Sequence, residues 1–148
     1  MKYISKNLKD TEKIASKLAK SLKPNDIIAY KGSMGMGKTA FTRALVVALG
    51  GDDVVSSPTF AIMNEYQSKL CPIYHFDMYR VTSVDDLYST GFFDFLDTNS
   101  LIIIEWSENI EDCLPKNTIF VDIALGEEET ERIILIDKEW NHDNISNG

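Results

Sequence analysis

Cysteine is scarce in this chain, with Cys71 and Cys113 as the two among 148 residues. They stand far apart, and neither has a partner at metal-ligand spacing, which argues against a disulfide framework and against a zinc site. His75 and His142 are equally isolated, and we expect packed or solvent-exposed histidines rather than metal ligands. The sequence therefore predicts reduced thiols and no zinc.

Basic residues are also in the minority, since 15 Lys and Arg stand against 23 Asp and Glu and give a net charge of −8. Binding to nucleic acid depends on neutralising phosphates, so this chain is not expected to hold RNA unaided. If its biology involves RNA, another subunit would hold the RNA.

Long apolar segments are absent from the sequence. The longest runs, Ala44 to Leu49 and Leu101 to Ile104, are far shorter than the roughly 20 residues that cross a bilayer. The first residues lack the apolar segment and the cleavage site of a secretion signal. We therefore expect a cytoplasmic protein with no membrane partner.

Residues 32–39 read Gly-Ser-Met-Gly-Met-Gly-Lys-Thr and match the pattern G-x-x-x-x-G-K-[ST]. In this pattern glycines let backbone N–H groups curl around phosphate oxygens, the lysine adds a positive charge, and the final hydroxyl reaches Mg²⁺. A β-rich run at 26–31 precedes the loop, and apolar residues at helical spacing follow it over 38–49. The anion would then lie at the N-terminus of that helix. We predict an ATP or GTP site formed by Gly32, Gly35, Met36, Gly37, Lys38, Thr39 and Ala40.

The remaining segments predict one α/β domain. Ile14, Leu18 and Leu22 mark an amphipathic helix that Asp10 or Thr11 can cap, and Ser83 opens a second helix through a capping box. The predicted strands cover residues 60–67, 72–79, 101–106, 119–124 and 132–137, of which the last two form an antiparallel pair around Gly126. Together they predict a single-domain P-loop NTPase with a mostly parallel central sheet, flanking helices and antiparallel strands at the edge. We expect this domain to span 1–138 and a polar, disordered tail to span 139–148.

Two carboxylates follow apolar strands in the sequence. Glu105 comes directly after Leu101–Ile104, which places it at the C-terminal edge of the sheet, where open α/β sheets bind ligands. Asp77 ends a second apolar segment and could face the same metal, although a structural carboxylate explains it equally well. Thr59, beside Pro58, resembles a switch residue that senses the γ-phosphate, although a rigid turn also explains Pro58.

Taken together, these segments resemble the TsaE (YjeE) family of small bacterial P-loop ATPases, which take part in tRNA threonylcarbamoyladenosine biosynthesis. The resemblance covers about residues 8 to 137. The segments that carry it are Gly32 to Thr39, Ser57-Pro58-Thr59-Phe60, Tyr74-His75-Phe76-Asp77-Met78-Tyr79-Arg80 and Ile104-Glu105-Trp106.

The resemblance implies residue roles that spacing alone does not. It implies that Lys38 and Thr39 contact phosphate and Mg²⁺, that Glu105 is a metal ligand, and that Asp77 supports the metal or the water. It also assigns Thr59 to the switch and places Thr11 and Arg132 near the nucleotide. The implied cofactors are ATP and Mg²⁺.

The resemblance also implies a weak, partner-stimulated ATPase. Such a subunit energises or resets the TsaD–TsaB complex, which transfers a threonylcarbamoyl group to an adenosine beside the anticodon, and it meets tRNA only indirectly. Two departures lie in the loop segment, because the family usually has an acidic residue in place of Ser33 and threonine or serine in place of Ala40. These departures could change hydrolysis or partner coupling while phosphate binding stays intact.

Three alternatives remain open from the sequence. A small-molecule P-loop kinase usually has several lid arginines, whereas this chain has only Arg43, Arg80 and Arg132. A regulatory GTPase would carry an Asn-Lys-x-Asp segment, which does not occur here. A nucleotide-gated interaction module would differ only in having no need for turnover.

Overall fold

A seven-stranded sheet organises the protein in the computed structural model, which describes residues 1–31, 37–51 and 63–137. The strands are β1 (Lys2–Ser5), β2 (Ile27–Lys31), β3 (Met63–Tyr66), β4 (Ile73–Asp77), β5 (Leu101–Glu105), β6 (Ile119–Leu125) and β7 (Arg132–Asp137). The helices are α1 (Leu8–Ala19), α2 (Lys38–Ala48) and α3 (Val84–Ser89), with the 3-10 helices η1 (Phe92–Phe95) and η2 (Ser107–Cys113). Within these ranges the strand order is β1-β7-β6-β2-β5-β4-β3.

The centre of the sheet is parallel. Strand β2 pairs in parallel with both β5 and β6, and β4 pairs in parallel with β5. The antiparallel strands lie outside this centre, with β3 beside β4 at one edge and β7 and β1 at the other. The predicted mostly parallel sheet with antiparallel edge strands is therefore confirmed.

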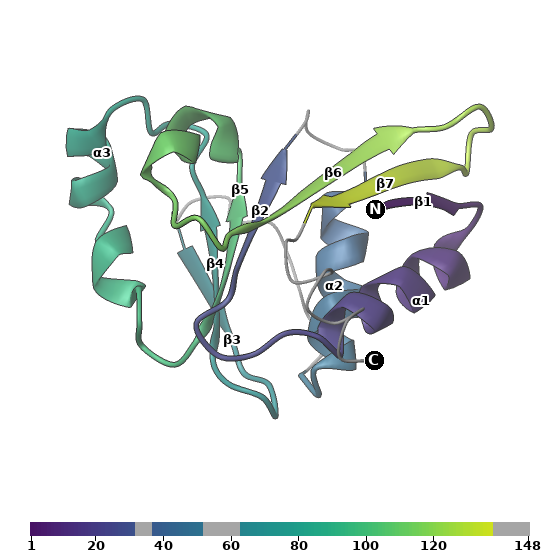
Figure 1. Ribbon diagram of the computed structural model, residues 1–148, viewed down its shortest axis with the longest axis horizontal. Coiled ribbons are helices and arrows are strands. Elements are labelled where there is room, and N and C mark those ends of the chain that lie inside the picture. The colour runs from purple at the N-terminus through teal and green to yellow at the C-terminus, as the bar shows by residue number, and fades with distance from the viewer. Residues whose placement is uncertain (32–36, 52–62, 138–148) are drawn as a thin grey trace.

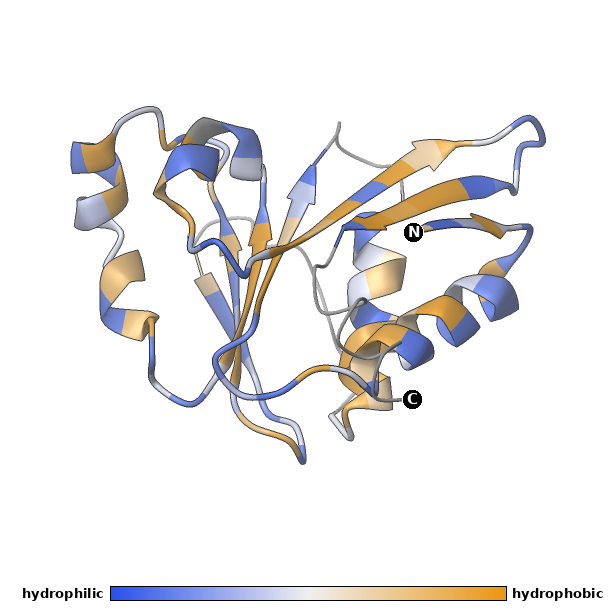
Figure 2. Ribbon diagram, viewed as in Figure 1, coloured by the Kyte–Doolittle hydropathy of each residue, from blue (hydrophilic) through white to orange (hydrophobic). Residues whose placement is uncertain are grey.

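Helices cover both faces of the sheet. Figure 1 shows α1 and α2 against one part of the sheet and α3 on the opposite side, beyond the segment that contains η2. Figure 2 shows that hydrophobic residues concentrate along the central strands, while the outward side of α1 is hydrophilic. This layering gives the sheet one hydrophobic core on each face.

Strand β5 shows how the sequence produces these two cores. All five of its residues are buried, and side chains along a strand alternate between faces. Leu101 and Ile103 belong to the core beneath α1 and α2, whereas Ile102 and Ile104 belong to the core beneath α3. This double burial explains why the segment reads as a continuous apolar run.

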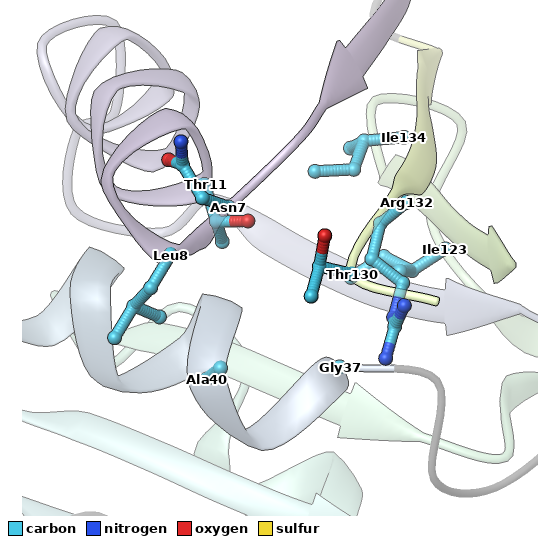
Figure 3. Close-up of a pocket in the computed structure, with 9 residues that line it drawn as sticks. All are labelled: Asn7, Leu8, Thr11, Gly37, Ala40, Ile123, Thr130, Arg132 and Ile134. Carbon is cyan, nitrogen blue, oxygen red and sulfur yellow. The ribbon is translucent and has the colours of Figure 1, made fainter. Parts of the chain in front are cut away.

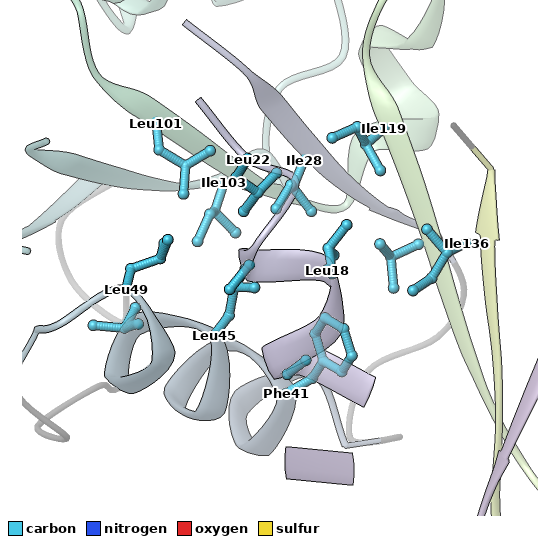
Figure 4. Close-up of a cluster of buried hydrophobic side chains, with 14 of the residues drawn as sticks. Leu18, Leu22, Ile28, Phe41, Leu45, Leu49, Leu101, Ile103, Ile119 and Ile136 are labelled. Atoms are coloured by element: carbon cyan, nitrogen blue, oxygen red, sulfur yellow. The ribbon is translucent and has the colours of Figure 1, made fainter. Parts of the chain in front are cut away.

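The two cores differ in composition. Figure 4 shows aliphatic side chains of α1, α2, β2, β5, β6 and β7 meeting between the helices and the sheet in the first core, with Phe41 of α2 among them. The second core is rich in aromatic residues, with Phe76 and Phe92 in an edge-to-face contact at 5.3 Å between ring centroids.

The N-terminal segment differs from the prediction in two respects. Strand β1 was not predicted, because it is short, has two exposed residues and depends on pairing with β7. The cap of α1 is Asn7, whose side chain accepts a 2.9 Å hydrogen bond from the N–H of Asp10, so the predicted cap at Asp10 or Thr11 was wrong. The first turn of α1 exposes Leu8, so apolar periodicity begins only farther along the helix.

Several local predictions are confirmed. Ser83 caps α3 by accepting from the N–H of Asp86, and β6 and β7 form the predicted antiparallel pair. The strands predicted at 60–67 and 72–79 correspond to β3 and β4, although residues 60–62 lie outside the described ranges. Residues 138–148 also lie outside them, so the domain boundary and the tail remain predictions. No helix in the described ranges is both long and apolar enough to cross a membrane.

Candidate functional site

Four of the predicted phosphate-binding residues, Gly37, Lys38, Thr39 and Ala40, lie at the start of α2, near the C-terminal edge of the parallel strands. Gly37 precedes the helix with a φ of 101°, a left-handed conformation that favours glycine. It caps the helix without a side-chain hydrogen bond, so the end of α2 presents backbone N–H groups and the positive end of the helix dipole. Such a terminus is suited to binding an anion.

Lys38 lies beside Trp106 at this terminus. The Lys38 side chain is buried, and its Nζ lies 5.3 Å from the centroid of the Trp106 ring, which is within the range of a cation–π interaction. Trp106 directly follows β5 and has a positive φ of 60°. Tyr79 packs edge-to-face on the same ring at 5.1 Å. Trp106 therefore packs beside the predicted phosphate lysine.

The two predicted carboxylates end neighbouring strands. Asp77 and Glu105 are paired in the register of β4 and β5, so both lie at the same edge of the sheet. Oδ1 of Asp77 accepts a 2.9 Å hydrogen bond from the N–H of Tyr79. Glu105 is only 9% exposed, and the burial of a carboxylate is costly unless it has a hydrogen-bond donor.

His75 provides a hydrogen bond to Glu105. Its Nε2 lies 3.0 Å from Oε2 of Glu105, and its Nδ1 lies 3.1 Å from the hydroxyl of Tyr66. A carboxylate can only accept, so the Nε2 proton is donated to Glu105. The histidine is therefore packed in the interior, as expected, but its contact with a predicted site residue was not foreseen.

Tyr30 adds a neutral polar group near Glu105. Its hydroxyl lies 2.6 Å from Oγ1 of Thr42 on α2. Complete burial, with a smaller contribution from the negative charge of Glu105, raises the pKa of the Tyr30 phenol far above its ordinary value. The phenol therefore stays protonated at physiological pH and links β2 to α2 without adding a charge.

A cavity of about 340 Å³ opens on the other side of the α2 terminus. Figure 3 shows that its walls come from the start of α1, the start of α2, β6 and the hairpin that leads into β7. The residues that line it are Asn7, Leu8, Thr11, Gly37, Ala40, Ile123, Thr130, Arg132 and Ile134. A mainly apolar cavity with a few polar groups is typical of small-ligand sites.

Besides Asn7, which caps α1, Thr11 and Arg132 in this cavity have defined partners. Thr11 Oγ1 lies 2.6 Å from Ser5 Oγ. Arg132 donates from Nη1 to the backbone oxygens of Glu129 and Glu131, and Figure 3 shows its side chain directed toward Gly37. The hairpin thus holds a positive charge close to the predicted phosphate site.

The structure brings the predicted residues together in two groups. Thr11, Gly37, Ala40 and Arg132 line one cavity, although they come from three separate parts of the sequence. Asp77 and Glu105 end paired strands at one edge of the sheet, and Lys38 of α2 lies beside Trp106, the residue that follows Glu105. Thr39 follows Lys38 on α2 and is half-buried. The predicted residues Gly32, Gly35, Met36 and Thr59 lie outside the described ranges.

The sequence did not point to several of the contributing residues. Asn7, Leu8, Ile123, Thr130 and Ile134 complete the cavity, but each resembles an ordinary cap, strand or turn residue in sequence. His75 could have been found from strand periodicity, because it precedes Asp77 by two positions on β4 and therefore shares its face.

No group of three or more His, Cys, Asp and Glu side chains forms a potential metal site within residues 1–31, 37–51 and 63–137. Mg²⁺, however, is commonly held by one or two carboxylates together with substrate phosphates. Oxygen donors of the kind that suit a hard cation are present on Thr39 in the first turn of α2 and on Asp77 and Glu105 at the ends of β4 and β5. The donor set therefore fits a Mg²⁺ ion that arrives with a nucleotide.

Comparison with known proteins gives consistent matches. The model of the family described as "Threonylcarbamoyl adenosine biosynthesis protein TsaE" matches residues 5–134. The tRNA threonylcarbamoyladenosine biosynthesis protein TsaE of Rickettsia felis is 40% identical over 126 residues, which cover 84% of this chain and 73% of that protein. The TsaE protein of Bacillus subtilis is 32% identical, with 99% of this chain and 98% of the relative covered. The crystal structure of Bacillus subtilis YdiB superposes with a TM-score of 0.70 at 28% identity and covers 98% of this chain and 89% of that one.

Proposed function

This chain belongs to the TsaE family, and from this membership we propose that it serves tRNA threonylcarbamoyladenosine biosynthesis as an ATP-binding and ATP-hydrolysing subunit. The observation that carries the proposal is a cavity at the start of α2 that is lined by Thr11, Gly37, Ala40 and Arg132 together. The loop motif predicts Gly37 and Ala40 as nucleotide contacts, and the family resemblance implies Thr11 and Arg132. The same proposal places the protein in the cytoplasm.

In the proposed complex the ATP phosphates lie at the N-terminus of α2. Lys38 contributes a positive charge there, while the backbone of Gly32, Gly35, Met36 and Gly37 surrounds the phosphate oxygens. The cavity at this terminus is the proposed location of the remainder of the nucleotide. Arg132, held by two hairpin carbonyls, adds a second positive charge on the cavity side.

The carboxylates supply the metal side of the proposed site. We assign Glu105 and Thr39 as ligands of a nucleotide-bound Mg²⁺, and Asp77 as a support for the metal or for the attacking water. When bound, the ion neutralises charge on the transferred phosphoryl group. Thr59 is assigned to a switch that responds to the γ-phosphate. Burial of Glu105 supports its assignment, because excluding water strengthens its attraction for a cation.

The proposed partner is the TsaD–TsaB transferase complex. Hydrolysis by this chain alone is expected to be weak and to rise when the pair is present, because the energy of ATP is used to drive or reset the complex. The net charge of −8 supports an indirect relation to tRNA, since an acidic surface repels phosphates.

A reconstituted modification assay tests this function. With TsaD, TsaB, ATP, a threonylcarbamoyl donor and tRNA, repeated turnovers are expected only when this chain is added, and ATP hydrolysis is expected to rise with the pair. Lys38→Ala is the control and should remove the stimulation. Repeated turnovers that proceed equally well without the chain, or a preference for GTP, would contradict the proposal.

The cavity can be tested through Ala40, which lines it from the first turn of α2. Ala40→Leu fills part of the space and is expected to weaken ATP binding about tenfold, which corresponds to about 1.4 kcal/mol. The matched control is Ala40→Thr, which introduces a residue that the family commonly has here and should stay within about twofold. Calorimetric titration with ATP measures both. Equal affinities for the leucine variant and the parent would show that the nucleotide lies elsewhere.

A further inference from the structure

A line of three polar side chains crosses the sheet diagonally and ends at Glu105. Tyr66 on β3 contacts His75 on β4, and His75 contacts Glu105 on β5, at 3.1 Å and 3.0 Å respectively. In the strand register Tyr66 is opposite Ile73 and His75 is opposite Ile103. Each contact therefore advances by two residues, and the line runs toward the C-terminal edge on one face of the sheet.

The inner two residues of this line, His75 and Glu105, are buried. His75 is 1% exposed and Glu105 is 9% exposed. A hydrogen bond to a charged group in such an environment is stronger than the same bond in water. The ring of Tyr66 also packs on the imidazole, with centroids 5.8 Å apart. The imidazole therefore has a fixed orientation and presents Nε2 to the carboxylate.

We propose that His75 is a positioning residue for Glu105. His75 holds Oε2 of Glu105, so that the other carboxylate oxygen is left to bind a nucleotide-bound Mg²⁺. Tyr66 in turn holds His75. Ligands of a metal are commonly oriented by a second layer of hydrogen bonds, and loss of such a partner costs about 10–100-fold in metal affinity or activity. The proposal rests on the assignment of Glu105 as a metal ligand in the proposed function.

Three substitutions test whether His75 acts by positioning Glu105 or only by filling space in the core. His75→Phe keeps a ring but removes both nitrogens, whereas His75→Gln keeps a side-chain amide that can still donate to Glu105. Tyr66→Phe removes only the outer hydroxyl. The matched control is Ser100→Ala, since Ser100 is 1% exposed, stands just before β5 at the end opposite Glu105, and has a hydroxyl 2.7 Å from that of Thr98. This control also removes a buried hydrogen bond, but far from the site.

The measured quantity is the gain in affinity that Mg²⁺ gives to a fluorescent N-methylanthraniloyl ATP analogue, taken as the ratio of dissociation constants in EDTA and in Mg²⁺. This gain is expected to fall at least about tenfold in His75→Phe, while the affinity in EDTA stays within about twofold of that of the parent. His75→Gln should recover most of the gain, Tyr66→Phe should show a smaller loss, and Ser100→Ala should match the parent. ATP turnover in His75→Phe should recover partly at high Mg²⁺, so the Mg²⁺ concentration for half-maximal rate should rise more than the maximal rate falls.

The outcomes distinguish this inference from the proposed function. If Glu105→Gln removes the Mg²⁺-linked gain while a folded His75→Phe keeps it, positioning by His75 is overturned and the function stands. If the parent shows no such gain, or Glu105→Gln keeps it, the metal assignment itself is wrong. Should His75→Phe fail to fold in a thermal melt, Tyr66→Phe decides, and a gain equal to that of the parent overturns the proposal.

Discussion

Glu105→Gln is expected to reduce ATP turnover about 100-fold or more while the variant still binds ATP. Glu105 is buried at the end of β5 and accepts a hydrogen bond from His75, and glutamine has nearly the same shape without the negative charge. A metal ion contributes several kcal/mol of charge stabilisation in the transition state, and a loss of about 3 kcal/mol corresponds to roughly 100-fold in rate. Steady-state hydrolysis with TsaD–TsaB present, together with a binding titration, measures both properties.

The same variant distinguishes the proposed enzyme from a nucleotide-gated interaction module. If turnover drives or resets the transferase complex, the modification assay should stop with Glu105→Gln after about one cycle. If bound ATP merely orders a surface, the variant should support modification at the rate of the parent. Glu12→Gln is a suitable control, because Glu12 is an exposed carboxylate on α1 that does not line the cavity and should change neither assay.

The two halves of the site differed in how far the sequence could predict them. Glu105 and Asp77 were predictable because each directly follows an apolar strand, and parallel strands bring their C-terminal ends to one edge. Thr11 and Arg132 came only from the family resemblance, since they reach the cavity through the packing of α1 and of the β6–β7 hairpin. No local pattern records such long-range packing.

The fold follows a similar division. The continuous apolar run of β5 and the alternation in β6 and β7 predicted the central sheet and one edge. Burial of a strand on both faces produces a continuous apolar run, and burial on one face produces alternation of apolar and polar residues. Strand β1 has no such pattern in its sequence, since its conformation is stabilised by pairing with β7. The start of α1 was also not predictable from apolar periodicity, because its first turn borders the cavity and does not pack on the hydrophobic core.

Phe41→Ala is expected to lower the free energy of unfolding by about 3–5 kcal/mol. Phe41 has no solvent exposure and contacts Tyr30 edge-to-face at 6.3 Å, in the core between α2 and the sheet. Total stabilities of small domains are about 5–15 kcal/mol, so this single change removes a large fraction. Urea denaturation should show a lower midpoint with an unchanged slope. Val47→Ala on the same helix, where the side chain is 48% exposed, should stay within about 0.5 kcal/mol.

Nucleotide binding provides the second half of this test. Phe41 lies in the first turn of α2, the same helix that carries Lys38, the proposed phosphate contact. ATP at 100 times its dissociation constant should stabilise the native state by about 2.7 kcal/mol. If the variant retains its site, ATP should restore that amount in Phe41→Ala and in the parent alike. Protection of the parent but not of the variant would mean that the core contact of Phe41 also fixes the position of the α2 terminus, so that packing and ligand binding depend on the same side chain.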